Sequence, residues 1–428
     1  MKKWKRALLS TLTACTLLMV NASAATFTQT ADTLKNMGLF AGTSTGYELD
    51  RAPTRAEAAT MLVRLLGKTA EAESEWDASG DTFAFRDMDD FDWAKPYVHW
   101  LSVHQLAAGT SADRFTPSAE CTAQMYAAFL MRALGYYESN GDFAFDDAIS
   151  FARSHGVINN VNYSGSSFLR DHVVAMSYTA LAAAPKSGGN DLLTRLVNDG
   201  AVSSSSASAE LQKFTDYRGY AQIMQQTSKE VSLQNVTSFS ISGGLSLDIA
   251  AVSEANLRGN TASSKSSLTI TRAGENPFVQ ERTGYYAGGR WYTSTDGAKT
   301  WIPMSSAPFA QPEAVPLLLI DSIRTDSTKY ILTYNSIGQT HYQTLLRQLL
   351  QTSGNTSALQ DLTINSLNAE IEVEDRTLTS LSTSVTASGK YAGSDVAVTA
   401  QQSSKITATG EQVSVQVPSD LSSYTQAS

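Results

Sequence analysis

The chain has 428 residues, of which 42% are hydrophobic and 17% charged, with a formal net charge of −9 at neutral pH. This length and apolar content allow two or three folded units with buried cores. The excess of acidic side chains argues against binding to nucleic acid or to anionic lipid headgroups, because both carry negative charge.

The first 24 residues have the features of an export signal. Residues 1–6 hold four basic side chains, residues 7–20 are mostly apolar, and Ala22-Ser23-Ala24 supplies the small residues of a cleavage site. The apolar run is too short for a comfortable membrane span, and no later segment reaches that length. Cleavage after Ala24 changes the net charge from −9 to −13, since no acidic residue is removed. The sequence predicts an exported, soluble protein without a transmembrane segment.

Leu12-Thr13-Ala14-Cys15 has the form of a bacterial lipoprotein signal, which leaves lipidation of Cys15 open. The apolar run continues past Cys15 to a better cleavage site, so ordinary cleavage is the preferred interpretation. Cys121 is then the only cysteine of the mature chain, and no intramolecular disulfide can form. We expect Cys121 to be a partly buried thiol.

A helical segment recurs three times, with repeats placed at residues 25–67, 85–135 and 143–184. A shift of 68 residues aligns Thr54 with Thr122 and Gly67 with Gly135, and a shift of 115 aligns Arg55 with Arg170. Each repeat is predicted to form a helix, a loop and a second helix. A lone helical hairpin cannot bury its apolar face, so we expect the three to pack as one all-α bundle.

The second helix of repeat 1 has a clear start signal. Thr54 can accept an amide N–H of the first turn, and Glu57 three residues later completes a capping box.

Residues 185–209 are rich in Ser and Gly and are predicted to form a linker with one helical turn at 192–197. A helix is expected at 210–231, followed by strands at 239–241, 245–249 and 268–271. Gly288-Gly289 predicts a tight hairpin over 285–292, and Asp296-Gly297 a second turn. Helices are expected at 313–323 and 342–350, then strands at 369–373, 378–385, 396–398 and 413–417. The fold class is therefore α+β and multidomain, with an antiparallel sheet and few helices in residues 210–428.

The three repeats resemble S-layer homology domains, which attach exported proteins to bacterial cell walls. Repeat 2 carries Phe85-Arg86-Asp87, Asp92-Trp93-Ala94 and Asp113-Arg114-Phe115-Thr116-Pro117, and repeat 1 carries Thr54-Arg55-Ala56-Glu57. The resemblance covers residues 27–183, and three tandem copies behind an export signal make it specific.

This resemblance implies a three-pronged assembly that binds secondary cell-wall polysaccharide, or another peptidoglycan-linked glycan, in grooves between repeats. It assigns a sugar carboxylate to Arg55, and by alignment to Arg170, because a guanidinium matches the planar shape of a carboxylate. Repeat 2 has Ala123 at this position, so its groove is expected to have lost carboxylate binding. The other expected ligand contacts are Thr54, Gly42, Gly109 and Trp93.

Simpler structural roles remain open for some of these residues. An arginine in the first turn of a helix can merely pair with a neighbouring acid. Trp93 and Trp100 can stack on sugar rings, but their spacing of seven favours a place in the helix core.

Residues 210–428 resemble, less specifically, the lipoprotein-carrier-like half-barrels of bacterial envelopes, in which a curved sheet wraps helices and can hold an acyl chain. This likeness is one of topology and transfers no ligand residue, and a filled apolar core is the alternative. A wall-anchored hydrolase with an unrecognised site in this region also remains open. His341 is the only histidine of this region, which contains no cysteine, so acid–base chemistry there would depend on carboxylates.

No motif indicates a catalytic, cofactor or metal site. The Gly-x-Ser-x-Gly pattern at 42–46 lies in a loop after a helix, whereas a nucleophile elbow lies between a strand and a helix. His99 and His104 are five residues apart and do not share a helix face, so a zinc site is unsupported. We therefore expect a non-enzymatic, wall-associated protein without a cofactor or metal.

Overall fold

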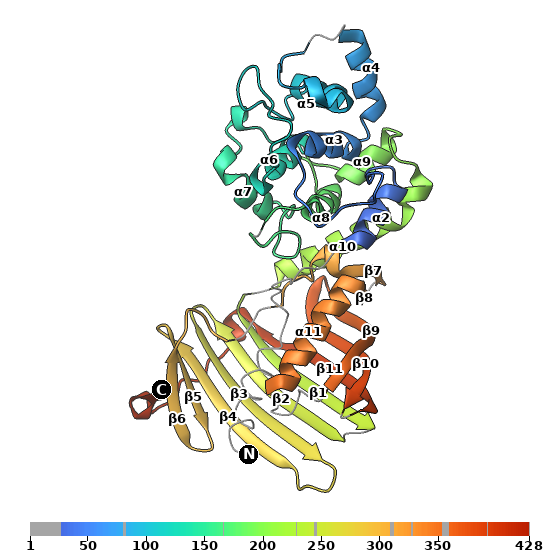
Figure 1. Ribbon diagram of the computed structural model, residues 1–428. Helices are drawn as coiled ribbons and strands as arrows, with labels where there is room; N and C mark the ends of the chain where they lie inside the picture. Colours follow the sequence, from blue (N-terminus) through green and yellow to red (C-terminus); the bar gives the residue numbers. More distant parts are fainter. Residues whose placement is uncertain are drawn as a thin grey trace. The chain divides into compact units, whose positions relative to one another are not determined.

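The computed structural model describes residues 27–79, 83–165, 167–227, 229–243, 246–308, 312–326, 328–352, 359–391 and 393–427. The chain divides into a helical unit, which ends at Thr215, and a sheet unit, which begins at Asp216 (Figure 1). The predicted α+β class is confirmed. The expected export signal, with Cys15, lies outside the described residues. None of the described helices is both long and apolar enough to cross a membrane.

The three repeats each place a second helix in the core of the helical unit. Repeat 1 contains α2 (Thr28–Asn36) and α3 (Arg55–Leu65); repeat 2 contains η1 (Asp89–Ala94), α5 (Lys95–Val103) and α6 (Ala123–Ala133); repeat 3 contains η3 (Phe145–Asp147), α7 (Ala148–Ser154) and α8 (Arg170–Leu181), and η2 (Glu138–Asn140) lies between repeats 2 and 3. Helix α6 packs against both α3 and α8. Its fully buried Tyr126 shares a hydrogen bond of 2.7 Å with Ser177 of α8.

Helices outside the repeats add to this unit. Helix α4 (Thr69–Ser79) packs against α5. Residues 185–209 contain α9 (Leu192–Asn198), which confirms the helical turn predicted at 192–197. They also contain the start of α10 (Ser204–Gln226), so the flexible connection expected in the Ser-rich stretch is corrected. Asp191 caps α9 by accepting the Thr194 N–H at 2.7 Å, and Leu193 is fully buried. Apolar contacts therefore fix a segment whose composition alone suggested flexibility.

The sheet unit contains one twelve-stranded sheet. Its order is β12-β6-β5-β4-β3-β2-β1-β11-β10-β9-β8-β7, and all neighbours are antiparallel except β12 and β6. The strands are β1 (Val231–Gly243), β2 (Leu247–Arg258), β3 (Thr261–Arg272), β4 (Phe278–Ala287), β5 (Arg290–Thr295), β6 (Ala298–Pro303), β7 (Ile320–Thr325), β8 (Lys329–Tyr334), β9 (Leu359–Glu374), β10 (Thr377–Tyr391), β11 (Ser394–Thr409) and β12 (Thr425–Gln426). Figure 1 shows α11 (Ser336–Thr352) on one face of this curved sheet, where it packs against β8 and β9.

Local turn signals placed the hairpins β4–β5 and β5–β6 correctly. Gly288 and Gly289 have φ of 57° and 76° and join β4 to β5, and Asp296 and Gly297 turn the chain into β6. The helix expected at 313–323 is wrong, because this segment forms η4 (Leu317–Leu319) and then strand β7. The strand expected at 413–417 is also wrong. That segment follows η6 (Gly410–Gln412) and crosses the sheet, and the Gln416 N–H donates to the Ser263 hydroxyl at 2.9 Å.

Candidate functional site

The predicted start of helix α3 is confirmed. The Glu57 N–H donates to Thr54 Oγ1 at 3.2 Å, and the Thr54 N–H donates to Glu57 Oε2 at 2.8 Å, which forms the complete capping box. In repeat 3 the ring of His172 takes the place of the glutamate, since its Nδ1 accepts the Leu169 N–H at 2.9 Å. Each cap fixes the direction in which the following arginine leaves the helix.

The first turns of α3 and α8 make the same backbone contacts with the loop of another repeat. In each, the first two helix amides donate to two loop carbonyls that lie two residues apart. The bonds are Arg55 N to Ala119 O at 2.8 Å, Ala56 N to Pro117 O at 3.1 Å, Arg170 N to Arg51 O at 2.9 Å, and Asp171 N to Leu49 O at 3.1 Å. We call these contacts the α3 junction, with the loop of repeat 2, and the α8 junction, with the loop of repeat 1. Each uses helix amides that have no intrahelical partner.

Arg55, the first expected ligand contact, is buried in the α3 junction with 4% of its surface exposed. Its Nε donates to Phe115 O at 2.8 Å, Nη2 to Ala108 O at 3.1 Å and Nη1 to Met125 Sδ at 3.3 Å, and the guanidinium lies 4.6 Å from the centre of the Phe115 ring. A guanidinium has five N–H donors, so one on each terminal nitrogen keeps no partner in the described part of the chain. Within that part, Arg55 forms no ion pair with a carboxylate.

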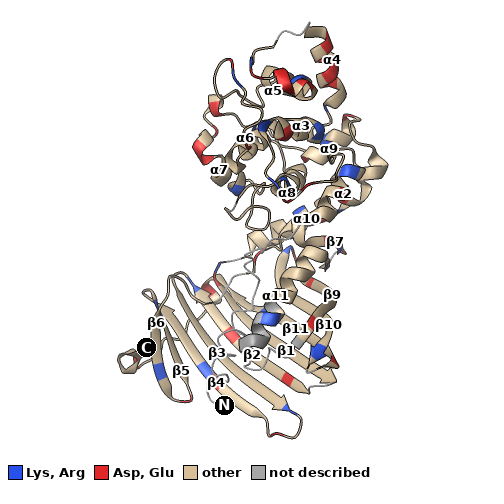
Figure 2. Cartoon of the chain, in the orientation of Figure 1, with Lys and Arg blue, Asp and Glu red and all other residues tan. Residues whose placement is uncertain are grey.

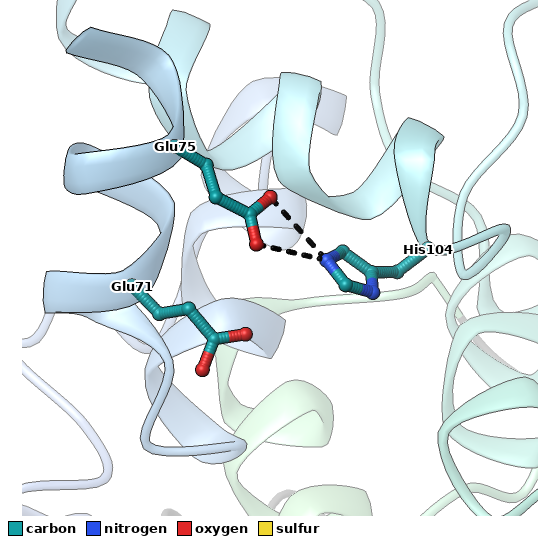
Figure 3. A group of neighbouring side chains, drawn as sticks. All are labelled: Glu71, Glu75 and His104. Carbon is teal, nitrogen blue, oxygen red and sulfur yellow. Dashed lines mark hydrogen bonds and ion pairs between the residues drawn. The ribbon is translucent and has the colours of Figure 1, made fainter. Parts of the chain in front are cut away.

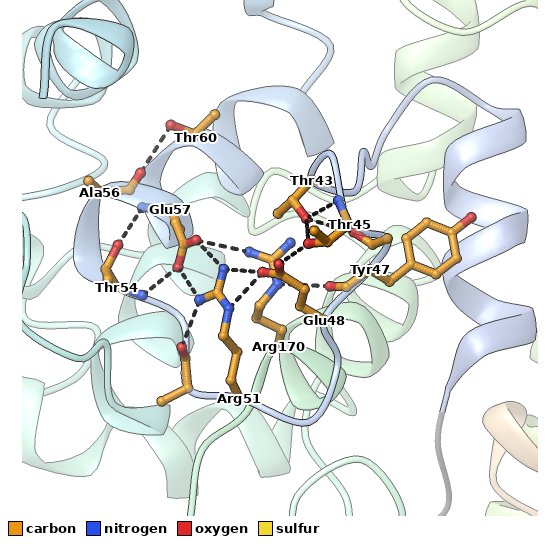
Figure 4. Close-up of polar contacts among 12 residues, drawn as sticks. Thr43, Thr45, Tyr47, Glu48, Arg51, Thr54, Ala56, Glu57, Thr60 and Arg170 are labelled. Carbon is orange, nitrogen blue, oxygen red and sulfur yellow. Dashed lines mark hydrogen bonds and ion pairs between the residues drawn. The ribbon is translucent and has the colours of Figure 1, made fainter.

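Arg170 makes the equivalent contact at the α8 junction but has an acidic partner. Its Nε donates to Tyr47 O at 2.9 Å, and Nη1 lies 3.5 Å from Glu57 Oε1. Glu57 also accepts two hydrogen bonds from Arg51, at 2.8 and 2.5 Å. Figure 4 shows these groups converging with Glu48, which accepts the Arg51 Nε–H at 2.7 Å. Two arginines and two glutamates therefore share one network.

The ionisation of this network follows from its hydrogen bonds. Burial opposes ionisation of Glu57, but the bonds from Arg51 and Thr54 and the charge of Arg170 outweigh it, so the pKa of Glu57 lies below its usual value. Hydrogen bonds from Thr45, Arg51 and Thr43 lower the pKa of Glu48 to about 2. Both carboxylates are therefore charged at neutral pH and balance the two arginines.

The α3 junction has a different charge balance. Burial lowers the pKa of Arg55, and the nearby charge of Asp87 opposes that shift only in part. Asp87 itself is engaged, since its carboxylate accepts the Phe115 and Thr116 N–H groups at 2.9 and 2.8 Å. Arg55 is thus a buried cation whose neighbours are mostly carbonyl groups.

Repeat 2 has no arginine in the first turn of α6, as its sequence predicted. Ala123 is buried with 3% of its surface exposed, and Thr122 caps the helix by accepting the Met125 N–H at 3.2 Å. The helix start is kept without the guanidinium, so only α3 and α8 have the arginine contact.

Gly42 and Gly109, two further expected ligand contacts, are required by close packing within their loops. A Cβ at Gly109 would lie 2.5 Å from Arg114 O and from Phe85 Cε1, and one at Gly42 would lie 2.6 Å from Gly46 O. The carbonyl next to Gly109 is Ala108 O, which accepts a bond from Arg55. Gly109 therefore helps to shape the Arg55 pocket.

The two tryptophans of repeat 2 differ in burial. Trp100 is in the core with 4% exposed, whereas Trp93 is 51% exposed, so the expectation of a core position is wrong for Trp93. The reason is a kink, because Trp93 lies in η1, where Phe91 has non-helical φ and ψ, and the helical period does not continue into α5. Trp93 is thus free to contact a ligand.

Cys121 is buried as a free thiol, and burial raises its pKa to about 12.

Among the described residues of the sheet unit, polar side chains interrupt the apolar face of the sheet. On the face that carries Phe239, Ile249 and Leu268, a row of polar side chains crosses neighbouring strands: Ser404, Asn235, Ser253, Ser266 and Arg282. A hollow of about 360 Å³ is lined mainly by Ser, Thr, Gln and Asp248 side chains of the opposite face. Neither feature supports a lipid carrier.

The sequence did not indicate that Glu48 and Arg51 complete the α8 junction. Their three-residue spacing is a weak signal of an ion pair, and their partner Glu57 lies across a loop. Nor could it show that Arg55 meets the carbonyls of Phe115 and Ala108, which lie 60 and 53 residues away.

Comparison with known proteins places this chain near cell-wall and cell-surface proteins. It is 29% identical over 147 residues to the middle cell wall protein of Brevibacillus brevis, 27% over 121 residues to a cell surface protein of Thermoanaerobacter kivui, and 29% over 93 residues to an endoglucanase of a Bacillus species. These matches cover 33, 28 and 22% of this chain, and 14, 15 and 10% of the relatives. No family model matches the chain.

Solved structures match this chain with low similarity. An S-type phycobiliprotein lyase of Guillardia theta and a LolA superfamily protein of Nitrosomonas europaea match 45 and 47% of this chain, and 99 and 96% of their own. Their sequence identities are 7 and 8% and their TM-scores 0.16 and 0.18, which are too low to support an argument.

Proposed function

We propose that the helical unit anchors this exported protein to the cell wall by binding the carboxylates of an acidic secondary wall polysaccharide, and that the sheet unit is a non-catalytic domain displayed at the surface. The observation that carries the proposal is Arg55, a buried cation without an ion-pair partner in the described part of the chain, which keeps one free N–H on each terminal nitrogen. The named wall and surface relatives support the location.

The charge balance indicates which junction binds. A buried charge without a partner is costly, and an anion that reaches it recovers that cost. A carboxylate can take two parallel N–H groups of a guanidinium in a charge-assisted pair. Arg170 already faces Glu57, so an anionic ligand gains less there. Trp93 supplies an exposed ring on repeat 2 for contact with a sugar.

The same substitution at the two junctions tests this assignment. The chain from residue 25 onward is mixed with purified bacterial cell wall and sedimented, and the bound fraction is measured against wall concentration. Arg55→Lys keeps the positive charge but loses the planar pair of guanidinium N–H donors. We expect binding to be about tenfold weaker, which corresponds to about 1.4 kcal/mol of binding free energy. Arg170→Lys is the matched control and should bind like the parent chain.

Three further measurements complete the test. Circular dichroism confirms that both variants remain folded, binding should weaken as salt concentration rises, and extraction of the secondary polymer from the wall should abolish it. Equal binding by the parent and Arg55→Lys would refute the role of Arg55. Failure of the parent chain to sediment with intact wall would refute the anchor.

A further inference from the structure

Helix α4 and the end of α5 bring together three side chains with metal-ligand chemistry. Glu71 and Glu75 lie one turn apart on α4, and His104 follows the last residue of α5. One ligand atom from each lies within 4.8 Å of the other two. Figure 3 shows both carboxylates and the imidazole directed toward the same space between the two helices.

The distance between His104 and Glu75 suits two ligands of one metal better than a hydrogen bond. His104 Nε2 lies 3.3 Å from both carboxylate oxygens of Glu75, so it favours neither. A charge-assisted hydrogen bond is usually about 2.8 Å long. Two ligands of a tetrahedral zinc ion, at bond lengths of about 2.1 Å, lie about 3.4 Å apart. Glu71 lies within 4.8 Å of both and is placed to supply the third ligand.

Neighbouring side chains hold these groups in place. The ring of Trp100 lies 4.3 Å from the ring of His104, and its indole N–H donates to Glu71 Oε1 at 3.1 Å. Lys68 donates to the other oxygen of Glu71 at 2.6 Å. Metal-binding carboxylates commonly have such outer partners, which orient them.

The charge of α4 favours a bound cation. The helix carries Glu71, Glu73, Glu75 and Asp77 and has no basic residue in its last turn (Figure 2). Like charges four residues apart, as at Glu71 and Glu75, destabilise a helix. A divalent cation between them reverses that effect and links α4 to α5.

We propose that Glu71, Glu75 and His104 bind a zinc ion, with water completing the coordination. Imidazole nitrogen and carboxylate oxygen are both zinc ligands, and a site with three protein ligands leaves the fourth position to solvent. Calcium and magnesium prefer six or more oxygen ligands and do not use imidazole in this way. Sequence spacing did not reveal the site because its ligands come from two helices.

Zinc binding to the chain from residue 25 onward tests the proposal. The protein, purified without a histidine tag and treated with EDTA, is titrated with zinc chloride and its melting temperature is followed. We expect a rise of a few degrees at saturating zinc, by preferential binding to the folded state. Calcium chloride at the same concentration should give no rise. Cobalt should produce a visible absorption band typical of a tetrahedral site.

Matched variants locate the ion. His104→Gln and Glu75→Gln should abolish the zinc shift and the cobalt band, whereas Glu73→Gln, on the same helix, and His155→Gln should retain them. The melting temperature of each variant in EDTA shows whether it is folded. A zinc shift that persists in His104→Gln, or its absence in the parent chain, would overturn the proposal, and an equal shift with calcium would overturn the choice of metal.

Discussion

At both the α3 and the α8 junction, an arginine in the first turn of a helix donates Nε to a loop carbonyl of another repeat, at 2.8 Å for Arg55 and 2.9 Å for Arg170. The backbone bonds around them are the same. The difference lies in charge, because Glu57 lies 3.5 Å from Arg170 and no carboxylate of the described part pairs with Arg55. The shared contact shows that both arginines have the same structural role at their junctions. The difference in charge indicates that Arg55, rather than Arg170, can bind an anionic ligand.

The largest expected effect comes from removing the charge of Glu57. Glu57→Gln can still accept the Thr54 N–H, so the cap of α3 is kept, but buried Arg170 loses its acidic partner. We expect the helical unit to lose about 3 kcal/mol of stability, since breaking a buried pair leaves an uncompensated charge. Denaturant unfolding followed at 222 nm measures this loss, with Glu120→Gln on the exposed loop of repeat 2 as control.

Acidification provides an independent check on Glu57. Its pKa is lowered in the folded state from an ordinary value of 4.5. The stabilisation it gives is therefore present above pH 4.5 and is lost as the pH falls through the lower, folded-state value. The hydrogen-exchange protection of the Arg170 and Asp171 amides, taken relative to the intrinsic exchange rate at each pH, should fall over that range in the parent chain but change less in Glu57→Gln. An equal pH response in both would contradict the role of Glu57.

The features that the sequence predicted correctly depend on near neighbours. The cap at Thr54 needs only Glu57, three residues away, and the turn at Gly288 needs only a residue that tolerates positive φ. In both cases the residues that form the contact are close together in the sequence, so the sequence alone is enough to predict it.

The errors occur where distant contacts decide the structure. The run Leu317 to Ile320 suits either a helix or a strand, and pairing of β7 with β8 selects the strand. Val413 lies in an alternating segment but has no neighbouring strand, and burial against the sheet fixes it instead. The carbonyl groups that surround Arg55 come from residues more than 50 positions away, so the resemblance identified the residue but did not predict its surroundings.

A smaller loss is expected from Arg55→Met. The substitution leaves Ala108 O without its donor, whereas Phe115 O keeps a hydrogen bond of 2.7 Å from the Thr116 hydroxyl, so we expect a cost of about 2 kcal/mol. Part of this cost is offset because a buried cation without an acidic partner is also removed. The loss should therefore be smaller than for Glu57→Gln, and hydrogen exchange should increase at the Arg55 and Ala56 amides. A larger loss would mean that Arg55 has a charged partner and would break the contrast between the junctions.

Arg282 of the sheet unit is a third buried arginine that can be compared with Arg55 and Arg170. It lies on β4 opposite Ser266 and Thr295, burial lowers its pKa, and its buried Nε has no hydrogen-bond partner. Replacing such a group with an apolar side chain of similar length removes a desolvation cost and breaks no bond at Nε. We expect Arg282→Met to change the stability of the sheet unit by less than about 1 kcal/mol, toward greater stability. Unfolding followed by tryptophan fluorescence, to which Trp291 on the neighbouring strand β5 contributes, measures this change. Arg258→Met, which loses a bond to Val413 O, is the comparison. A loss above about 2 kcal/mol would show that Arg282 is paired, since only a broken buried interaction costs that much.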